Sequence, residues 1–307
     1  MIVNGNYPTM VTPYDRDGNI DRKTVRNLTE WYWRQNCAGV FSVCQSSEVF
    51  YLTLREKIAL NAAVTECARE LNDRGERKYF SVVASGHTSE CIAAQAEELA
   101  AMWETGPDAV VLITNRLDIA DTSEEKWCED LHKMLDLLPK DIKLGLYEAP
   151  VPYKRLLTPK MLSECAKDDR FVFFKDTCCD ADTIRSRCAL LKGSALKLFN
   201  ANAQTLSLSL ADGASGYCGI MSNFIPALIN RICENYSDAD VQEIQDFVGI
   251  AAFTEYLHYP VTAKYYLNKY AGVAMRTESR SRRLKELPAY DCFVMDSLYR
   301  AANRYER

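Results

Sequence analysis

The sequence of 307 residues lacks several patterns that would define its class at once. It has no basic stripe, and its formal net charge is -5, which disfavours nucleic acid as a partner. No apolar run approaches the roughly 18 residues that cross a bilayer. The first residues show no basic region followed by an apolar region, so no signal peptide is recognised. We therefore expect a cytoplasmic protein without a membrane partner.

Metal-site patterns are also missing. The twelve cysteines are scattered without a Cys-x-x-Cys pair, and the three histidines do not form a zinc-type cluster with them. The adjacent Cys178 and Cys179 have poor geometry for an ordinary disulfide. We expect reduced thiols packed as small hydrophobic groups, and no metal ion.

The sequence does have an apolar run at 171–174 that leads directly into Lys175. Desolvation at the end of a buried strand favours a neutral amine, and a neutral amine attacks carbonyl carbons. Schiff-base chemistry is therefore one interpretation of Lys175. The other is that the side chain turns outward where its strand meets solvent, as most lysines do.

Short apolar runs, rich in β-branched or aromatic residues, alternate with helix-like segments along the chain. This alternation predicts βαβ units around a parallel sheet. Eight units within about 220 residues predict an α/β fold, a (β/α)8 TIM barrel. The predicted strands are 8–12, 39–43, 80–84, 109–113, 143–147, 171–174, 195–199 and 216–220. The predicted helices between them are 22–35, 54–71, 89–104, 123–138, 158–166, 181–191 and 203–211.

The strand pattern stops after about residue 224, and only helix-like segments follow. We predict a barrel domain with the catalytic site at 1–224 and a C-terminal helical subdomain at 225–307. A basic cluster runs from Arg276 to Lys285. It could bind an anionic partner, although a solvated connection is the simpler interpretation. The helices predicted in this part are 226–236, 238–258, 260–271 and 291–305.

Chemically useful side chains follow several of the predicted strands, where barrels place their active sites. Tyr147 ends strand 5 and could move protons on a carbinolamine. Gln45, Ser46 and Ser47 follow strand 2, and their amide, hydroxyl and backbone N–H groups could hold a carboxylate. Gly216, near strand 8, would let a ligand or lysine approach the backbone closely.

Three further residues complete the candidates. Arg116, after strand 4, is a candidate to bind a second carboxylate or a polyhydroxy tail. Ile220, at the end of strand 8, is included among the substrate-binding residues. Lys197 lies in the run at 195–199 and is a competing amine. Each residue alone has an ordinary structural explanation, so only their combination indicates a site.

The ordered motifs resemble those of the dihydrodipicolinate synthase / N-acetylneuraminate lyase family of Schiff-base aldolases. The resemblance covers nearly the whole chain, and it depends on the order of the motifs more than on any one of them. The stretches that carry it are Val11-Thr12-Pro13-Tyr14, Gln45-Ser46-Ser47-Glu48, Leu146-Tyr147…Pro150 and Phe174-Lys175-Asp176-Thr177.

The resemblance implies that a pyruvate-type 2-oxo acid forms a Schiff base on Lys175, without an external cofactor, and that an aldehyde is the second substrate. Tyr147 matches the tyrosine that relays protons. Ser46 matches the residue that holds the carboxylate, helped by the Ser47 backbone, while Gln45 replaces a hydroxyl residue. Family members are commonly tetramers, so a homo-oligomer is implied, either a homotetramer or a dimer.

Departures from the family pattern disfavour its two best-known reactions. The synthase arginine five residues after the strand-5 tyrosine is Pro152 here, and the synthase tyrosine after strand 4 is replaced within 115–117. The two carboxylates that sialic acid lyases carry after strand 7 are replaced by Ala203 and Gln204. Glu148 stands where the family usually has asparagine, and the sequence assigns it no role.

Three functions remain open from the sequence. The leading one is reversible aldol cleavage or condensation of a 2-oxo acid. The second is a Schiff-base dehydratase that removes water from a sugar acid with its carbon skeleton intact. The third is a non-catalytic barrel that binds an oxo acid or sugar acid. The presence of both Lys175 and Tyr147 argues against a pure binder, because binding alone needs neither an amine nor a proton relay.

Overall fold

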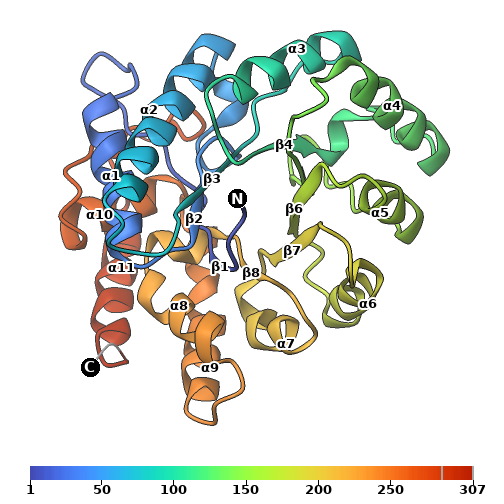
Figure 1. Ribbon diagram of the computed structural model, residues 1–307. Coiled ribbons are helices and arrows are strands. Elements are labelled where there is room, and N and C mark those ends of the chain that lie inside the picture. The colour runs from blue at the N-terminus through green and yellow to red at the C-terminus, as the bar shows by residue number, and fades with distance from the viewer. Residues whose placement is uncertain (285, 306–307) are drawn as a thin grey trace.

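Eight parallel strands form one sheet in the order β1-β8-β7-β6-β5-β4-β3-β2 (Figure 1). The computed structural model describes residues 1–284 and 286–305. β1 pairs with β8, and a parallel bridge between Thr9 and Phe41 joins the first strand segment to β2. The sheet thus closes on itself with helices around it, which confirms the predicted (β/α)8 barrel.

The strands are short, as is usual for barrels, and most lie where the apolar runs predicted them. Their bounds are β1 Gly5–Asn6, β2 Gly39–Phe41, β3 Ser81–Ala84, β4 Ala109–Ile113, β5 Leu144–Tyr147, β6 Phe171–Asp176, β7 Lys197–Asn200 and β8 Gly216–Tyr217.

The barrel helices alternate with these strands, and several begin at a residue that caps them. Thr53 accepts a hydrogen bond from the backbone N–H of Glu56, whose side chain accepts one in return at the start of α2. The helices are α1 Arg22–Arg34, α2 Leu54–Asp73, α3 Ile92–Trp103, α4 Glu124–Leu137, α5 Pro159–Ala166, α6 Ala181–Leu191 and α7 Leu206–Ala211, with 3-10 turns η1 Val49–Tyr51, η2 Thr114–Arg116, η3 Ala203–Thr205 and η4 Ile220–Asn223.

Two strand predictions need correction. The first strand begins earlier than the predicted run 8–12, because its ladder with β8 starts at Gly5 and Thr9 makes only an isolated bridge. The eighth ends at Tyr217, and Ile220 opens the turn η4. In both places, apolar residues beside a strand are as buried as the strand itself, so composition does not mark the boundary.

Aromatic rings fill the inside of the barrel. Phe173 stacks on Phe199 with ring centroids 4.6 Å apart, and Tyr7 lies edge-on to Phe199 at 4.8 Å. Phe41 lies edge-on to Phe173 at 6.1 Å. Because side chains alternate along a strand, Phe173 points into the barrel while Phe174 packs in the layer between strands and helices. This aromatic layer forms a solid floor beneath the carboxyl ends of the strands.

The chain after β8 is helical, as predicted: α8 Pro226–Asn235, α9 Val241–Ala251, the turn η5 Ala252–Tyr256, α10 Val261–Tyr270 and α11 Ala289–Ala302 (Figure 1). α8 packs against β1 and β8 and so occupies the eighth helix position of the barrel. The division into domains at residue 224 stays a prediction. Lys285 of the basic cluster lies outside the described residues.

Among residues 1–284 and 286–305, no helix is both long and apolar enough to cross a membrane. The same residues include no group of three or more His, Cys, Asp or Glu side chains placed to hold a metal ion. All twelve cysteines are free.

Candidate active site

Lys175 and Tyr147 face each other on neighbouring strands. They are Cα partners in the ladder between β6 and β5, so their side chains point to the same side of the sheet. The Lys175 amine lies 4.4 Å from the centroid of the Tyr147 ring and 5.7 Å from that of Phe41. Lys175 is only 5% exposed, and no carboxylate of the described residues lies within 4.0 Å of its amine. The side chain therefore points inward, onto the aromatic floor.

A cavity of about 320 Å³ opens above these two residues, at the carboxyl ends of the strands. Five of the predicted site residues line it: Gln45, Ser46, Tyr147, Lys175 and Ile220. The other lining residues are Glu48, Val49, Phe50, Tyr51, Pro150, Val151, Tyr259, Pro260, Ser281 and Arg282.

A second cavity of about 500 Å³ opens at the opposite end of the barrel, beside Trp33 and Arg77. Lys197 lies at this amino end, where its amine donates to the carbonyl oxygen of Ile2 at 2.8 Å and to Asn4 at 2.9 Å. Barrel enzymes place their chemistry at the carboxyl ends of the strands. The smaller cavity with Lys175 is therefore the candidate active site, and Lys197 lies outside it.

Among the three predicted residues of the loop after β2, two line the cavity and one bonds within the loop. The Ser47 hydroxyl is bonded within the loop, accepting from the Cys44 N–H at 2.5 Å and donating to the Cys44 carbonyl at 2.8 Å. Ser46 lines the cavity beside the phenol of Tyr259. The Gln45 side-chain oxygen is buried and has no hydrogen-bond partner among the described residues. Gln45 and Ser46 are thus available to a ligand, while the Ser47 side chain shapes the loop.

Two other predicted residues are placed elsewhere. Arg116 is buried, and its guanidinium donates to the carbonyl oxygen of Ser89 at 3.1 Å, away from the cavity-lining residues. Gly216 faces the backbone of Gly5, whose carbonyl oxygen would lie only 1.9 Å from an added Cβ. The close approach at Gly216 is therefore made by the chain itself, where β8 meets β1.

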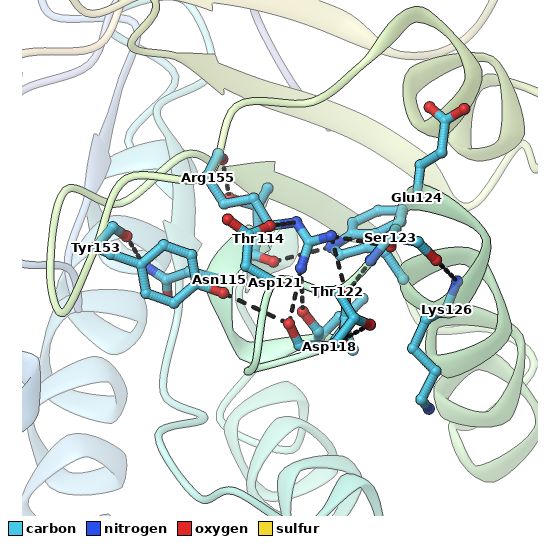
Figure 2. Close-up of polar contacts among 12 residues, drawn as sticks. Thr114, Asn115, Asp118, Asp121, Thr122, Ser123, Glu124, Lys126, Tyr153 and Arg155 are labelled. Carbon is cyan, nitrogen blue, oxygen red and sulfur yellow. Dashed lines mark hydrogen bonds and ion pairs between the residues drawn. The ribbon is translucent and has the colours of Figure 1, made fainter.

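Arg155, the arginine nearest to the family's substrate-binding position after strand 5, is also occupied. Its guanidinium donates to the Asp118 carboxylate at 3.1 Å, to the Asp118 carbonyl at 2.7 Å and to the Ser123 carbonyl at 3.0 Å, and it pairs with Asp121 at 3.1 Å (Figure 2). Because these contacts hold a side chain that is 5% exposed, Arg155 anchors the loops after β4 and β5.

Glu148, to which the sequence assigned no role, belongs to a buried ionic cluster that links the ends of β5 and β6 to α6. Its carboxylate accepts from both terminal nitrogens of Arg187, at 2.7 and 3.2 Å, and Arg187 also pairs with Asp176. Glu148 further accepts from the backbone N–H of Thr177 at 2.9 Å and of Leu157 at 2.8 Å. Burial raises the pKa of Glu148, while the charge of Arg187 opposes that rise. The cluster ties together the residues that directly follow Tyr147 and Lys175.

Burial sets the protonation of the groups around Lys175. It raises the pKa of the Tyr147 phenol well above 10, so this phenol is neutral near pH 7 and can donate a proton. It raises the pKa of the Cys218 thiol to about 12. It also raises the pKa of Glu255, in η5, to about 7, although the charge of Lys175 favours the ionised carboxylate.

Sequence reasoning missed the part of the cavity wall that the C-terminal region supplies. Tyr259, Ser281 and Arg282 line the cavity but lie far from Lys175 in the chain. The available signal was the basic cluster beginning at Arg276, for which a solvated connection was the simpler interpretation. Glu255 gave no sequence signal, because its position depends on how η5 packs near η4.

A (β/α)8 barrel with a buried lysine at the end of its sixth strand, beside a strand-5 tyrosine, defines the class of the protein: a class I aldolase or lyase. The family model described as "Dihydrodipicolinate synthetase family" matches residues 3–253. The chain therefore belongs to the dihydrodipicolinate synthetase family.

Individual relatives are distant in sequence and close in fold. The chain is 22% identical to 4-hydroxy-tetrahydrodipicolinate synthase of Coxiella burnetii, over 75% of this chain and 74% of the relative. It is 23% identical to the Acidithiobacillus ferrooxidans enzyme of the same name, over 81% of this chain and 78% of the relative. Among solved structures, dihydrodipicolinate synthase from Bacillus anthracis has a TM-score of 0.84 at 18% identity, with 98% and 99% of the two chains covered. Sialic acid aldolase from Ruminococcus gnavus has a TM-score of 0.83 at 17% identity, covering 100% and 99%.

Proposed function

We propose that the protein is a Schiff-base aldolase that cleaves or forms a carbon–carbon bond next to a pyruvate-type 2-oxo acid. The observation that carries this proposal is the position of the Lys175 amine, 4.4 Å above the Tyr147 ring at the floor of a cavity. An amine without a carboxylate partner is free to attack, and a neutral phenol beside it can exchange protons with the adduct.

The substrate carboxylate is proposed to bind at the loop after β2. Ser46 presents its side chain to the cavity, and the backbone N–H groups of Ser46 and Ser47 have no acceptor among the described residues. Backbone N–H groups and a hydroxyl on one turn can together hold the two oxygens of a carboxylate. The unpaired oxygen of Gln45 can accept a hydrogen bond from a substrate hydroxyl.

In the proposed cycle, the Lys175 amine adds to the ketone carbon, and the carbinolamine loses its hydroxyl group as water to give an iminium. In the cleavage direction, the bond between C3 and C4 breaks and its electron pair moves toward the iminium, giving an enamine. The proton of the C4 hydroxyl leaves as the aldehyde forms, and Tyr147 is the proposed relay. Protonation of C3 and hydrolysis then release the oxo acid. The lysine supplies the electron sink, so the cycle requires no dissociable cofactor.

Borohydride reduction in the presence of pyruvate tests this proposal. We expect a stable adduct on Lys175, located by peptide mass spectrometry, and its loss in Lys175→Ala. Lys197→Ala is the matched control and should keep the adduct, because Lys197 lies at the other end of the barrel. Absence of any adduct, or an adduct on Lys197, would contradict the assignment.

Products separate the proposed reaction from the other two. Release of pyruvate or a related oxo acid indicates aldol cleavage, whereas loss of water with the carbon skeleton intact indicates dehydration. Thermal stabilisation by an oxo acid without any product would indicate a binding protein. The homo-oligomeric state implied by the family is also a proposal, which sedimentation analysis can test.

A further inference from the structure

The irregular segment 279–282, between α10 and α11, forms part of the rim of the cavity that contains Lys175. Ser281 and Arg282 both line this cavity. No regular secondary structure includes them, so other contacts must hold them there. Those contacts decide whether Arg282 is a solvated surface residue or part of the site.

Buried Glu48 fixes the segment to the loop after β2. One oxygen of its carboxylate accepts from the backbone N–H of Ser281 and from the Ser279 hydroxyl, both at 2.7 Å. The other oxygen lies 3.4 Å from the Lys264 amine, and both charged groups are shielded from solvent. Burial alone would raise the pKa of Glu48, but Lys264 and these hydrogen bonds outweigh it and hold the pKa below its usual value.

Arg280 adds a second attachment. Its guanidinium pairs with Glu56 at 2.6 Å and donates to the carbonyl oxygens of Tyr51 at 3.0 Å and Gly18 at 2.9 Å. Arg282 is therefore the last residue of a segment whose preceding residues are held by Glu48 and Glu56. Its place at the rim is set by the same loop that carries Gln45 and Ser46.

The arginines near the site differ in whether their guanidinium groups already form an ion pair with a carboxylate of the protein. Arg280 pairs with Glu56, and Arg155 pairs with Asp118 and Asp121 (Figure 2). Within the described part of the chain, no carboxylate lies within 4.0 Å of Arg282. Among the described residues, its side chain makes one hydrogen bond, a long contact of 3.4 Å from Nε to the Tyr259 carbonyl, which leaves the terminal nitrogens free.

The charges that line the cavity are therefore unbalanced. Arg282 is cationic, and the proposed iminium on Lys175 is cationic too, while Glu48 is the one acidic residue among the described lining residues and is neutralised by Lys264. A planar guanidinium binds carboxylate or phosphate oxygens through two parallel hydrogen bonds. A substrate with one anionic group would leave Arg282 without a partner.

We propose that Arg282 binds a second anionic group, a carboxylate or a phosphate, on the carbonyl compound that reacts with the lysine-bound 2-oxo acid. This inference rests on the function proposed above for the same site. It assigns the substrate class as 2-oxo acids with an anionic group at the far end of the chain. It also places the residue that selects them in the C-terminal region.

Matched pairs of 2-oxo acids test the proposal by borohydride trapping. 2-Oxoadipate and 2-oxohexanoate have the same carbon chain but differ in a distal carboxylate. 2-Oxo-3-deoxygluconate with and without a 6-phosphate provides the phosphate pair. In Arg282→Gln, we expect the half-saturating concentration of the anionic member of a pair to rise about 10-fold, with the neutral member unchanged.

Arg283→Gln is the matched control, because Arg283 is exposed like Arg282 but does not line the cavity. It should leave both members of each pair unchanged, and Arg282→Lys should restore part of the selectivity. Selectivity in the phosphate pair alone assigns a phosphate, and selectivity in the carboxylate pair alone assigns a carboxylate. Equal effects of Arg282→Gln on charged and neutral members overturn the Arg282 proposal while the adduct persists. Wild-type protein that traps neither these acids nor pyruvate would instead overturn the proposed function itself, whereas trapping of pyruvate alone would overturn the Arg282 proposal.

Discussion

The floor and the rim of the cavity are built in different ways. On the floor, adjacent strands hold Tyr147 and Lys175, and the ionic cluster around Arg187 holds the residues that follow them. On the rim, the segment 279–282 depends on hydrogen bonds to Glu48 from a distant part of the chain. The difference indicates that strand register places the proposed reacting groups, whereas a few polar contacts place the proposed selecting group. Changes to the floor should therefore affect chemistry or the fold, and changes to the rim should affect selectivity.

The largest expected effect on the floor comes from Tyr147→Phe. Removing a general acid or base slows a reaction by about 10²- to 10⁴-fold, so turnover should fall by that amount while trapping of the oxo acid on Lys175 continues. Steady-state kinetics and borohydride trapping on the same preparation measure both. Tyr79→Phe is the control, because its phenol bonds Asp108 on the exposed surface. Unchanged turnover in Tyr147→Phe would remove the phenol from the mechanism.

Arg187→Met should lower the free energy of unfolding by about 3–5 kcal/mol, because it leaves the carboxylates of Glu148 and Asp176 buried without a cation. Urea denaturation measures the change. Arg185→Met, two residues away on α6, removes surface ion pairs with Asp182 and Asp212 and should cost at most about 1 kcal/mol. Similar losses in the two variants would mean that the cluster is not a special support of the floor.

Glu48→Gln should loosen the rim with a smaller cost in overall stability, about 1–3 kcal/mol. Burial lowers the pKa of Lys264 to about 8, and removing the Glu48 charge lowers that pKa further, which weakens the hold of Lys264 on its proton. We expect trypsin to cleave within 276–283 faster in the variant than in the wild type, and mass spectrometry measures the rate of cleavage. Glu66→Gln, which affects only an exposed contact with Arg26, should leave the cleavage rate unchanged. Resistance to trypsin in Glu48→Gln would show that Glu48 does not hold the segment.

The smallest expected effect is a dependence of stability on pH that comes from Glu255. Its pKa of about 7 in the folded state exceeds the ordinary value of 4.5, so between these pH values the folded protein binds more protons than the unfolded chain. Stability from this group is fully present below about pH 4.5 and is lost as the pH rises to about 7. The Glu255 carboxyl group interacts electrostatically with Lys175, Tyr217 and Tyr259, and the raised pKa values of both phenols keep them neutral over this range.

Glu255→Gln removes this dependence on pH. Urea denaturation at pH 5 and pH 8 should therefore show the variant gaining stability relative to wild type as the pH rises. A constant difference in stability between the two proteins at both pH values would show that the pKa of Glu255 in the folded state is not raised.

The sequence predicted the barrel and the floor because both depend on local patterns. Alternation along 171–176 places Lys175 on the same face as Phe173, and the order of the strands places Tyr147 beside it. The rim could not be predicted in this way. The hydrogen bond between Ser281 and Glu48 joins residues 233 positions apart, and no periodicity records such a contact.

Arg116 shows that the sequence can also assign to the site a residue that does not line the cavity. It follows β4 at the expected end of the barrel, yet its side chain turns to the Ser89 carbonyl. Arg282, which the sequence placed in a basic connection, reaches the cavity. Residue type and strand order indicate which end of a barrel a side chain occupies, but not whether it points into the cavity, because loop packing decides that direction.

The attachment of 279–282 to Glu48 also has a consequence for how the gene can change. The codons for Lys175 and Arg282 lie far apart, so recombination or drift in the last part of the gene can change the anion that we propose Arg282 binds without altering the codons for Tyr147 and Lys175. A lineage could thus acquire new substrates while its chemistry is inherited unchanged, provided that each new segment keeps a donor for Glu48.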